Sequence, residues 1–278
     1  MDIKEIEVLD EKYPKRLLKN KDKPIKIYAL GNLELLNSKK TIGIVGSRNC
    51  SKYGIGVTYE FSKELSKNGI CIISGMAIGI DEIANTTAID YEGKTIAVLG
   101  GGFYDIYPKE NEWLFYKILN NGGCIISEYP PEIKTDTKKM PKRNRIISGL
   151  SDAVIIVEAK IKSGTGITAK YAKEQGKEVY VTPSNIDSIN GKGTNKLIYN
   201  GAKILLSPQE LIENKKIEVI MKEEYREIYN ILSEKPIHIN DIVKKVKRPI
   251  DELNSIITMM EIEGYIVQTQ TNFFIIRE

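Results

Sequence analysis

Seven short runs of β-branched and other apolar residues recur between residues 41 and 208, and helix-like stretches separate them. The runs are apolar throughout instead of alternating with polar residues, which is typical of strands that are buried on both faces of a sheet. Several of the helix-like stretches end at a glycine, a common residue just past the end of a helix. The runs are 41–49, 69–75, 95–102, 123–130, 152–159, 178–184 and 202–208.

Strands that alternate with helices of roughly 10–15 residues predict an α/β protein with a doubly wound, mostly parallel, Rossmann-like sheet. Sheets of this kind bind ligands outside the carboxyl ends of their strands, at the point where the strand order reverses. The glycine-rich, serine-rich and acidic segments of this chain directly follow the runs. We therefore expect them at that edge of the sheet.

Both ends of the chain depart from this pattern. Near the start, a proline turn precedes the apolar run 25–31, which we expect to add a short strand to the edge of the sheet. A charged run at 213–216 indicates a linker. The segment after it is predicted to form three helices and a two-stranded hairpin, the order found in a winged helix. We predict two domains, residues 1–210 and 219–278.

Composition removes several classes of function. No run approaches the ~18 consecutive apolar residues of a membrane span, and the first residues lack the apolar core of a secretory signal. We therefore expect a cytoplasmic protein that does not bind membranes. The three cysteines are widely spaced, and His238 is the single histidine, so neither a metal site nor a histidine-dependent triad is expected. A formal net charge of +4 is too small to indicate a partner by itself.

Two segments of small residues are suited to bind phosphate. One follows the first central strand and the other follows the run 152–159, and each leads into a helix. The free N–H groups at the start of a helix attract anions, and an arginine can hold a phosphate with two hydrogen bonds. The alternative is a pair of tight turns without a ligand. The residues concerned are Gly46, Ser47, Arg48, Ser163, Gly164 and Thr165.

The main basic cluster lies between residues 134 and 145, where six lysines and arginines accompany one aspartate. It leads directly into an apolar helix expected at 146–151, so part of it should be held near the phosphate-suited segments. Nucleic acid is the ligand that such a cluster favours, and a solvated loop is the alternative. The candidate contacts within it are Lys138, Lys139, Lys142, Arg143 and Arg145.

With these segments the sequence resembles the DprA/Smf family, the DNA-processing proteins of bacterial transformation. The matching segments extend in order from about residue 13 to residue 206, and they include IGIVGSR, SGMAIGID and SGTGITA. The most specific of them is PKRNRIISGLS, which contains the basic residues of 142–145.

The resemblance implies an extended Rossmann-like fold that binds single-stranded DNA, forms a homodimer, and protects incoming DNA while it helps to load the recombinase RecA. It implies no enzymatic activity, and we expect no cofactor. Carried over to this chain, it makes Arg48, Lys142, Arg143 and Arg145 the main DNA contacts. Asn144 and the SGTG loop would line the same pocket.

Three positions depart from the family pattern. Ile78 occupies the place of a usual arginine, and Asn85 that of a usual histidine. Met140 replaces the aromatic residue that normally precedes Pro141. A methionine is a weaker platform than an aromatic ring for stacking a base.

Two other functions stay open from the residues alone. A nucleoside-monophosphate phosphoribohydrolase needs a carboxylate near its phosphate loop, and Glu128 and Glu158 at strand ends are the candidates, although no acid follows the SGTG loop. A nucleotide-sensing module is the other possibility. In the second domain, the basic residues of 244–248 admit contact with duplex DNA, docking to a partner, or simple solvation.

Overall fold

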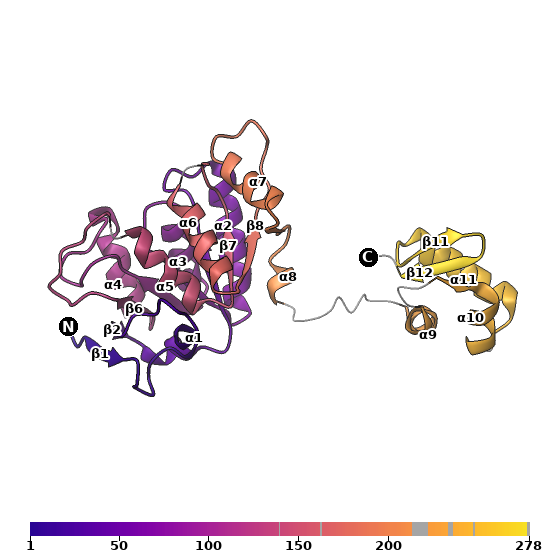
Figure 1. The fold of residues 1–278 in the computed structure, drawn as a ribbon, viewed down its shortest axis with the longest axis horizontal. Helices are drawn as coiled ribbons and strands as arrows, with labels where there is room; N and C mark the ends of the chain where they lie inside the picture. Colours follow the sequence, from indigo (N-terminus) through magenta and orange to yellow (C-terminus); the bar gives the residue numbers. More distant parts are fainter. Residues whose placement is uncertain (139, 162, 213–221, 233–235, 247, 277–278) are drawn as a thin grey trace. The chain divides into compact units, whose positions relative to one another are not determined.

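The computed structural model divides the chain into two compact units, Met1–Asn214 and Lys215–Glu278 (Figure 1). The predicted linker at 213–216 lies outside the described residues, and so does Lys139. The structure describes residues 1–138, 140–161, 163–212, 222–232, 236–246 and 248–276.

The first unit is built on a nine-stranded sheet. Its strands are β1 Lys4–Glu7, β2 Lys26–Gly31, β3 Thr41–Val45, β4 Cys71–Ser74, β5 Thr95–Val98, β6 Cys124–Ser127, β7 Ala153–Ile156, β8 Glu178–Val181 and β9 Lys203–Ile204. They are arranged in the order β1-β2-β6-β5-β4-β3-β7-β8-β9, and those from β6 to β9 run parallel. β2 and β1 are added antiparallel beyond β6. The chain moves outward from β3 to β6 and returns to β7 on the other side of β3, so the strand order reverses between β3 and β7.

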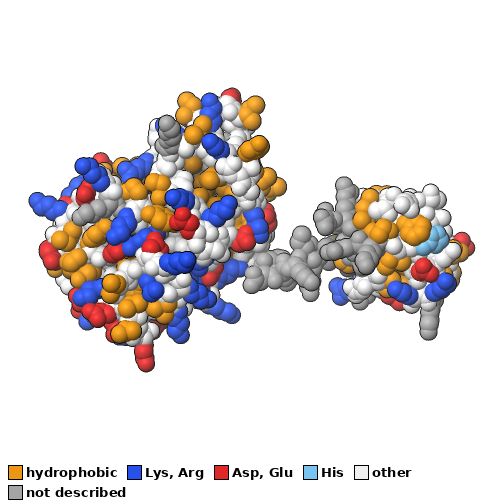
Figure 2. Space-filling model, in the orientation of Figure 1, with side chains coloured by type: hydrophobic (Ala, Val, Ile, Leu, Met, Phe, Trp, Pro, Cys, Tyr) orange, Lys and Arg blue, Asp and Glu red, His pale blue; other side chains and the backbone are white. Residues whose placement is uncertain are grey.

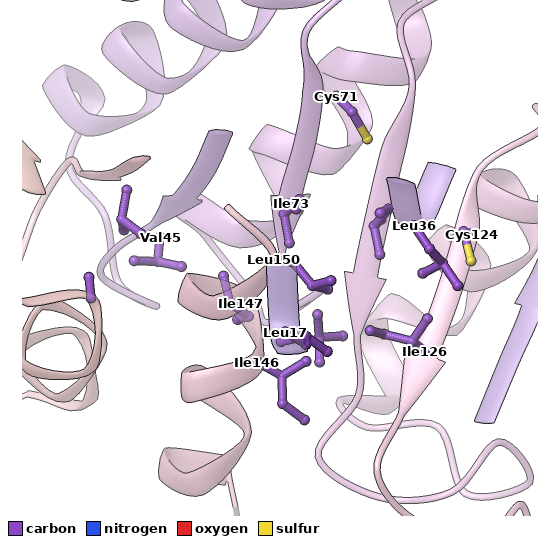
Figure 3. Packing of buried hydrophobic residues seen from close by; sticks show 14 of the residues in the cluster. Leu17, Leu36, Val45, Cys71, Ile73, Cys124, Ile126, Ile146, Ile147 and Leu150 are labelled. Atoms are coloured by element: carbon purple, nitrogen blue, oxygen red, sulfur yellow. The ribbon is translucent and has the colours of Figure 1, made fainter. Parts of the chain in front are cut away.

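Helices cover both faces of this sheet. They are α1 Lys15–Leu18, α2 Lys52–Lys67, α3 Ile80–Asp90, α4 Glu112–Asn120, α5 Met140–Leu150, α6 Gly164–Glu174, α7 Lys192–Tyr199 and α8 Gln209–Ile212, with 3-10 helices at Leu33–Asn37 and Lys109–Asn111. Successive strand residues point into opposite cores, so that Ile72 packs with α2 and α3 whereas Ile73 packs with α5. Figure 3 shows the core that contains Ile73, where Ile146 and Leu150 of α5 lie beside Leu17 of α1. The predicted doubly wound α/β fold is confirmed.

Two predictions about the sheet are wrong in detail. β8 and β9 are not buried on both faces, because β9 forms the edge of the sheet: Val179 and Tyr180 are half-buried, and both residues of β9 are exposed. The run 25–31 does form a strand, β2, but not the edge strand. The short β1, with Ile6 as its single buried residue, continues the sheet beyond β2.

The second unit has the predicted order of three helices and a hairpin. Its elements are α9 Glu223–Ile231, β10 Ile237–His238, α10 Ile239–Val246, α11 Ile250–Ile262, β11 Ile266–Gln270 and β12 Phe273–Ile276. The strands form a sheet of order β10-β12-β11, so β10 adds a strand that the sequence analysis did not predict. Tyr225, Ile242, Leu253 and Phe274 belong to a separate apolar core. The winged-helix fold is confirmed.

Candidate nucleic-acid interface

A cavity of about 340 Å³ opens at the carboxyl edge of the sheet, where the strand order reverses. β3 and β7 pair there in parallel with Val45 opposite Ile156, so the segments that follow them leave the sheet side by side. This is the place at which doubly wound sheets bind their ligands. We call this cavity the Arg48 pocket. Its lining includes Gly46, Ser47, Arg48, Asn49, Asp81, Met140, Arg143, Asn144, Lys160, Ser163, Gly164, Thr165 and Thr168.

The segment after β3 places an exposed arginine at this pocket. Gly79 approaches the segment closely: its φ is +86°, and a Cβ atom there would lie 2.6 Å from the carbonyl oxygen of Ser47. The Arg48 side chain forms no ion pair with any residue that the structure describes, and its Nη2 donates to the Met140 sulfur at 3.1 Å. A guanidinium without a carboxylate partner is free to bind a phosphate with two hydrogen bonds.

The start of α6 forms another side of the pocket. The Thr165 hydroxyl donates to the carbonyl oxygen of Gly46 at 3.2 Å, which ties the two small-residue segments together. The hydroxyls of Ser163 and Thr168 are buried and have no hydrogen-bond partner among the described residues. Buried hydroxyls without partners are unusual. Together with the N–H groups and the positive dipole end of α6, they suit an anion.

A buried charge pair lies at the inner end of the pocket. Arg143 is 4 % exposed and donates from Nη1 to the carbonyl oxygens of Gly75, at 2.8 Å, and Val98. The Asp81 carboxylate accepts the Gly75 N–H at 3.1 Å. A Cβ atom on Gly75 would lie 2.5 Å from both the Arg143 guanidinium and the Asp81 carboxylate, so the close approach of these groups requires glycine there.

Burial and charge act in opposite directions on this pair. Burial raises the pKa of Asp81 to about 6, and the Arg143 charge and the Gly75 N–H limit the rise. Burial also lowers the pKa of Arg143, to about 10, so that Arg143 remains a cation at neutral pH. The sequence alone does not identify Asp81 as part of the site. The signal was its position in SGMAIGID, but an acid in the first turn of a helix is equally well explained by helix capping.

The basic residues predicted as DNA contacts point in different directions, because the segment that contains them is helical. α5 begins at Met140, whereas the sequence analysis expected a helix only from 146. Neighbouring side chains on a helix point about 100° apart, so four consecutive residues cannot share one face. Arg143 and Asn144 line the pocket, and the Asn144 amide donates to the Gly164 carbonyl oxygen at 3.3 Å.

The other predicted basic residues lie elsewhere. Arg145 is 5 % exposed and binds Glu128 at 2.5 Å and Asp22 at 3.4 Å, away from the pocket lining. Lys142 is exposed and lies 3.6 Å from the same Glu128 carboxylate. Lys138 is exposed in the loop before α5 and does not line the pocket.

The departures from the family pattern also have defined places. Ile78 is partly exposed, and Asn85 is buried with its amide bonded to the Thr95 hydroxyl at 2.7 Å. Met140 is buried beside Arg48, so it forms part of the pocket wall and not an open stacking surface. Among the described residues, the lining of the Arg48 pocket contains no aromatic side chain.

The two carboxylates considered for an enzyme are both engaged in structural contacts. Glu158 is 1 % exposed and accepts from the Ser51 N–H at 2.8 Å and from the Ser51 hydroxyl at 2.6 Å, which caps the start of α2. Glu128 is paired with Arg145. Neither lines the Arg48 pocket, whose one carboxylate among the described residues is that of Asp81. Over the described part of the chain, no cluster of histidine, cysteine and acidic residues could hold a metal ion.

The charged side chains on one face of the larger unit are mixed in sign. On the face shown in Figure 2, Lys and Arg side chains are interspersed with Asp and Glu and form no continuous patch on the larger unit.

None of the helices within the described ranges has both the length and the apolar composition needed to cross a bilayer.

Comparison with known families agrees with this architecture. Residues 4–216 match the family model of DNA recombination-mediator protein A, and residues 220–270 match the DprA winged helix domain. The chain belongs to the DNA recombination-mediator protein A family. The DprA/Smf resemblance inferred from the sequence motifs is thereby confirmed.

Relatives in this family match most of the chain. The DNA processing protein DprA of Bacillus subtilis is 41 % identical over 211 residues, which cover 76 % of this chain and 71 % of that protein. Protein Smf of Escherichia coli is 40 % identical over 204 residues. That match covers 73 % of this chain but 54 % of Smf, so the chain spans about half the length of this relative.

Two solved structures of the family share the fold. DNA processing protein A of Streptococcus pneumoniae superimposes with a TM-score of 0.71 and 38 % identity, over 76 % of this chain and 74 % of that chain. A structure that concerns the single-stranded DNA binding mode of DNA processing protein A from Helicobacter pylori gives a TM-score of 0.69 and 32 % identity. The match covers 94 % of that chain and 76 % of this one.

Proposed function

We propose that this protein binds single-stranded DNA in the Arg48 pocket and acts, without catalysing a reaction, as a recombination mediator. The observation that carries the proposal is an exposed arginine in the same pocket as a helix start and two buried hydroxyls. Among the side chains that the structure describes, Arg48 bonds to the Met140 sulfur but has no ion-pair partner, and the two hydroxyls have no hydrogen-bond partner. Each of these groups binds phosphate readily. Single-stranded DNA binding by the relative from Helicobacter pylori supports the choice of ligand.

The proposal assigns different roles to the predicted site residues. Arg48 and the backbone of Gly46, Ser47 and Gly164 bind a phosphate, with the unpartnered hydroxyls of Ser163 and Thr168 beside it. Thr165 ties the two small-residue segments together. Arg143 supplies buried positive charge, and Asn144 holds the start of α6. Lys138 and Lys142 contribute screened attraction from outside the pocket, and we propose Lys139, which lies outside the described residues, as a further basic contact. Such contacts to phosphates position a strand without reading its sequence.

The wider role follows the family resemblance. We propose that the protein is a cytoplasmic homodimer that protects incoming strands during natural transformation and helps to load RecA onto them. Sedimentation at several concentrations tests the dimer. Stimulation of RecA filament formation on strands coated with single-strand-binding protein tests the loading. A monomer at every concentration, or no stimulation, would contradict the respective part.

The absence of catalysis has its own test. A phosphoribohydrolase would release base from nucleoside monophosphates, and the pure protein should release none. Neither Glu128 nor Glu158 reaches the Arg48 pocket, which supports this expectation.

The winged helix presents few basic residues to which duplex DNA could bind. From residue 249 to residue 276, which spans α11 and the hairpin, the sequence contains neither lysine nor arginine. Arg248 is paired with Glu227 and Glu252. Lys244 on α10 is also paired, with Asp241 at 3.2 Å, so Lys245 is the one residue in the described part of the cluster without an ion pair there. Lys247 lies outside the described residues.

A fragment ending at residue 216 should fold by itself and keep its affinity for single strands. The three cores of the first unit contain no residue of the second, so removing the winged helix exposes none of them. We expect a cooperative thermal transition, single-strand affinity within about twofold of the full chain, and loss of any duplex binding. The measurement is an anisotropy titration of both proteins with labelled single-stranded and duplex oligonucleotides. A fragment that melts cooperatively but no longer binds single strands would place the main site in the winged helix.

Binding should weaken as the pH rises through about 6, because Asp81 then becomes charged beside the phosphate site. Its raised pKa means that the folded state holds the proton more tightly than the unfolded chain, so Asp81 also lowers folding stability as the pH rises from about 4 to about 6. A bound phosphate that raises this pKa by about one further unit lowers the affinity about tenfold above pH 7. Titrations at about pH 5 and about pH 8 measure the effect, which Asp81→Asn should remove. An equal pH dependence in both proteins would exclude Asp81 as its source.

A further inference from the structure

A second cavity, of about 530 Å³, lies at the carboxyl edge of the sheet, next to the Arg48 pocket in sequence and in space. It is lined by Ser51, Tyr53, Glu158, Pro183, Ser184, Asn185 and Ser188. These residues follow β7 and β8 or open α2, so the cavity lies on the β8 side of the switch point. We call it the Tyr53 cavity.

One short segment connects the two cavities. Asn49 lines the Arg48 pocket and Ser51 lines the Tyr53 cavity, so the Cα atoms of Arg48 and Ser51 are at most ~11 Å apart. The Asn190 amide donates to the Asn49 carbonyl oxygen at 2.8 Å, which fastens this segment to the loop after β8. A strand whose phosphate is bound at Arg48 therefore passes within reach of the Tyr53 cavity.

The Tyr53 cavity offers a fixed aromatic ring. Tyr53 is 46 % exposed, and its hydroxyl donates to the Pro183 carbonyl oxygen at 2.7 Å, which restrains the ring at the cavity wall. Nearby, Asn185 is exposed, and its side-chain amide makes no hydrogen bond with the described residues. An aromatic face with a free amide beside it suits a nucleobase, which stacks by its face and forms hydrogen bonds by its edge.

The charge of the cavity excludes a phosphate. The start of α2 would attract an anion, but the buried Glu158 carboxylate already accepts its Ser51 N–H and hydroxyl. A second anion there would face an uncompensated negative charge, whereas a neutral base would not. The cavity is thus suited to the part of a nucleotide that the Arg48 pocket does not bind.

We propose that the Tyr53 cavity is a base subsite, in which the base next to the Arg48-bound phosphate stacks on Tyr53. This inference rests on the proposed binding of single-stranded DNA. It also accounts for the lack of an aromatic side chain in the Arg48 pocket, where Met140 replaces the usual ring: the stacking surface lies one cavity further along the same edge.

Two probes with equal numbers of phosphates test the subsite, a labelled oligothymidine and an abasic oligonucleotide of the same length. Tyr53→Ala should weaken oligothymidine binding about 5- to 150-fold, which corresponds to the loss of one base–aromatic stack, and leave abasic binding unchanged. Tyr53→Phe keeps the ring and should stay within about threefold of the wild type. Tyr116→Ala, which removes an exposed tyrosine from α4, is the matched control and should bind as the wild type does.

Stacking also has a spectroscopic readout. A 2-aminopurine placed in the oligonucleotide should lose fluorescence on binding the wild type, and less on binding Tyr53→Ala. An equal loss of affinity for both probes, a Tyr53→Phe variant as weak as Tyr53→Ala, or unchanged oligothymidine binding by Tyr53→Ala would each overturn the subsite. A wild-type protein that binds neither probe would instead overturn the proposed function, and the subsite with it.

Discussion

Replacing Arg145 with alanine should lower the free energy of unfolding by roughly 3–5 kcal/mol while leaving the DNA site in place. Removing one partner of a buried ion pair strands the other charge, and this is among the most destabilising single changes in a protein. Arg145 is buried and holds Glu128 at 2.5 Å, while Asp22 lies 3.4 Å away. Urea denaturation gives the stability, and anisotropy titration below the unfolding transition gives the affinity.

Lys142→Ala is the matched control, because Lys142 also approaches Glu128, at 3.6 Å, but is exposed. Exposed ion pairs contribute roughly 0–1 kcal/mol, so this variant should melt near the wild type. If Arg145→Ala kept its stability and lost DNA binding, Arg145 would be a DNA contact after all, as the family resemblance implied.

Arg48→Ala should weaken single-strand binding about 10- to 100-fold for every sequence tested. Hydrogen bonds to charged groups contribute about 1.5–3 kcal/mol, and phosphate contacts do not distinguish bases. Arg48→Lys should restore part of the loss, because a lysine retains the charge but cannot form two parallel hydrogen bonds to one phosphate. The unfolding curve of Arg48→Ala should match that of the wild type, because Arg48 is exposed and forms no ion pair with the described residues.

The control for Arg48 is Arg248→Ala, which removes an arginine from the winged helix and should leave single-strand affinity unchanged. Full recovery by Arg48→Lys would mean that only the charge matters. Wild-type affinity in Arg48→Ala would exclude the pocket as the site.

Much of the fold could be predicted because its determinants are local. The apolar runs at 41–49, 69–75 and 95–102 each contain a buried parallel strand, and a strand buried on both faces needs a continuous apolar run. The exposed β9 and the short β1 were harder, because an edge strand has one neighbour and little burial to leave a pattern in the sequence.

The residues of the candidate site also differ in whether the sequence could place them. Gly46, Ser47 and Arg48 could be placed because they directly follow a strand, and the edge at which parallel strands end is known in advance. The roles of Arg143 and Arg145 could not, because they depend on where α5 begins and on partners such as Gly75 and Glu128, far away in the sequence. Two arginines of one motif thus make different contacts, and only the three-dimensional structure separates them.

If the Arg48 pocket holds a phosphate of single-stranded DNA, the salt dependence of binding should change when Arg48 is removed. On single strands, each phosphate contact contributes about −0.7 to the slope of log K against log salt concentration. The slope for Arg48→Ala should therefore be flatter than that of the wild type by about 0.7, with a parallel loss of affinity at low salt. Identical slopes in the two proteins would mean that Arg48 neutralises no phosphate, and this would contradict phosphate binding in the Arg48 pocket.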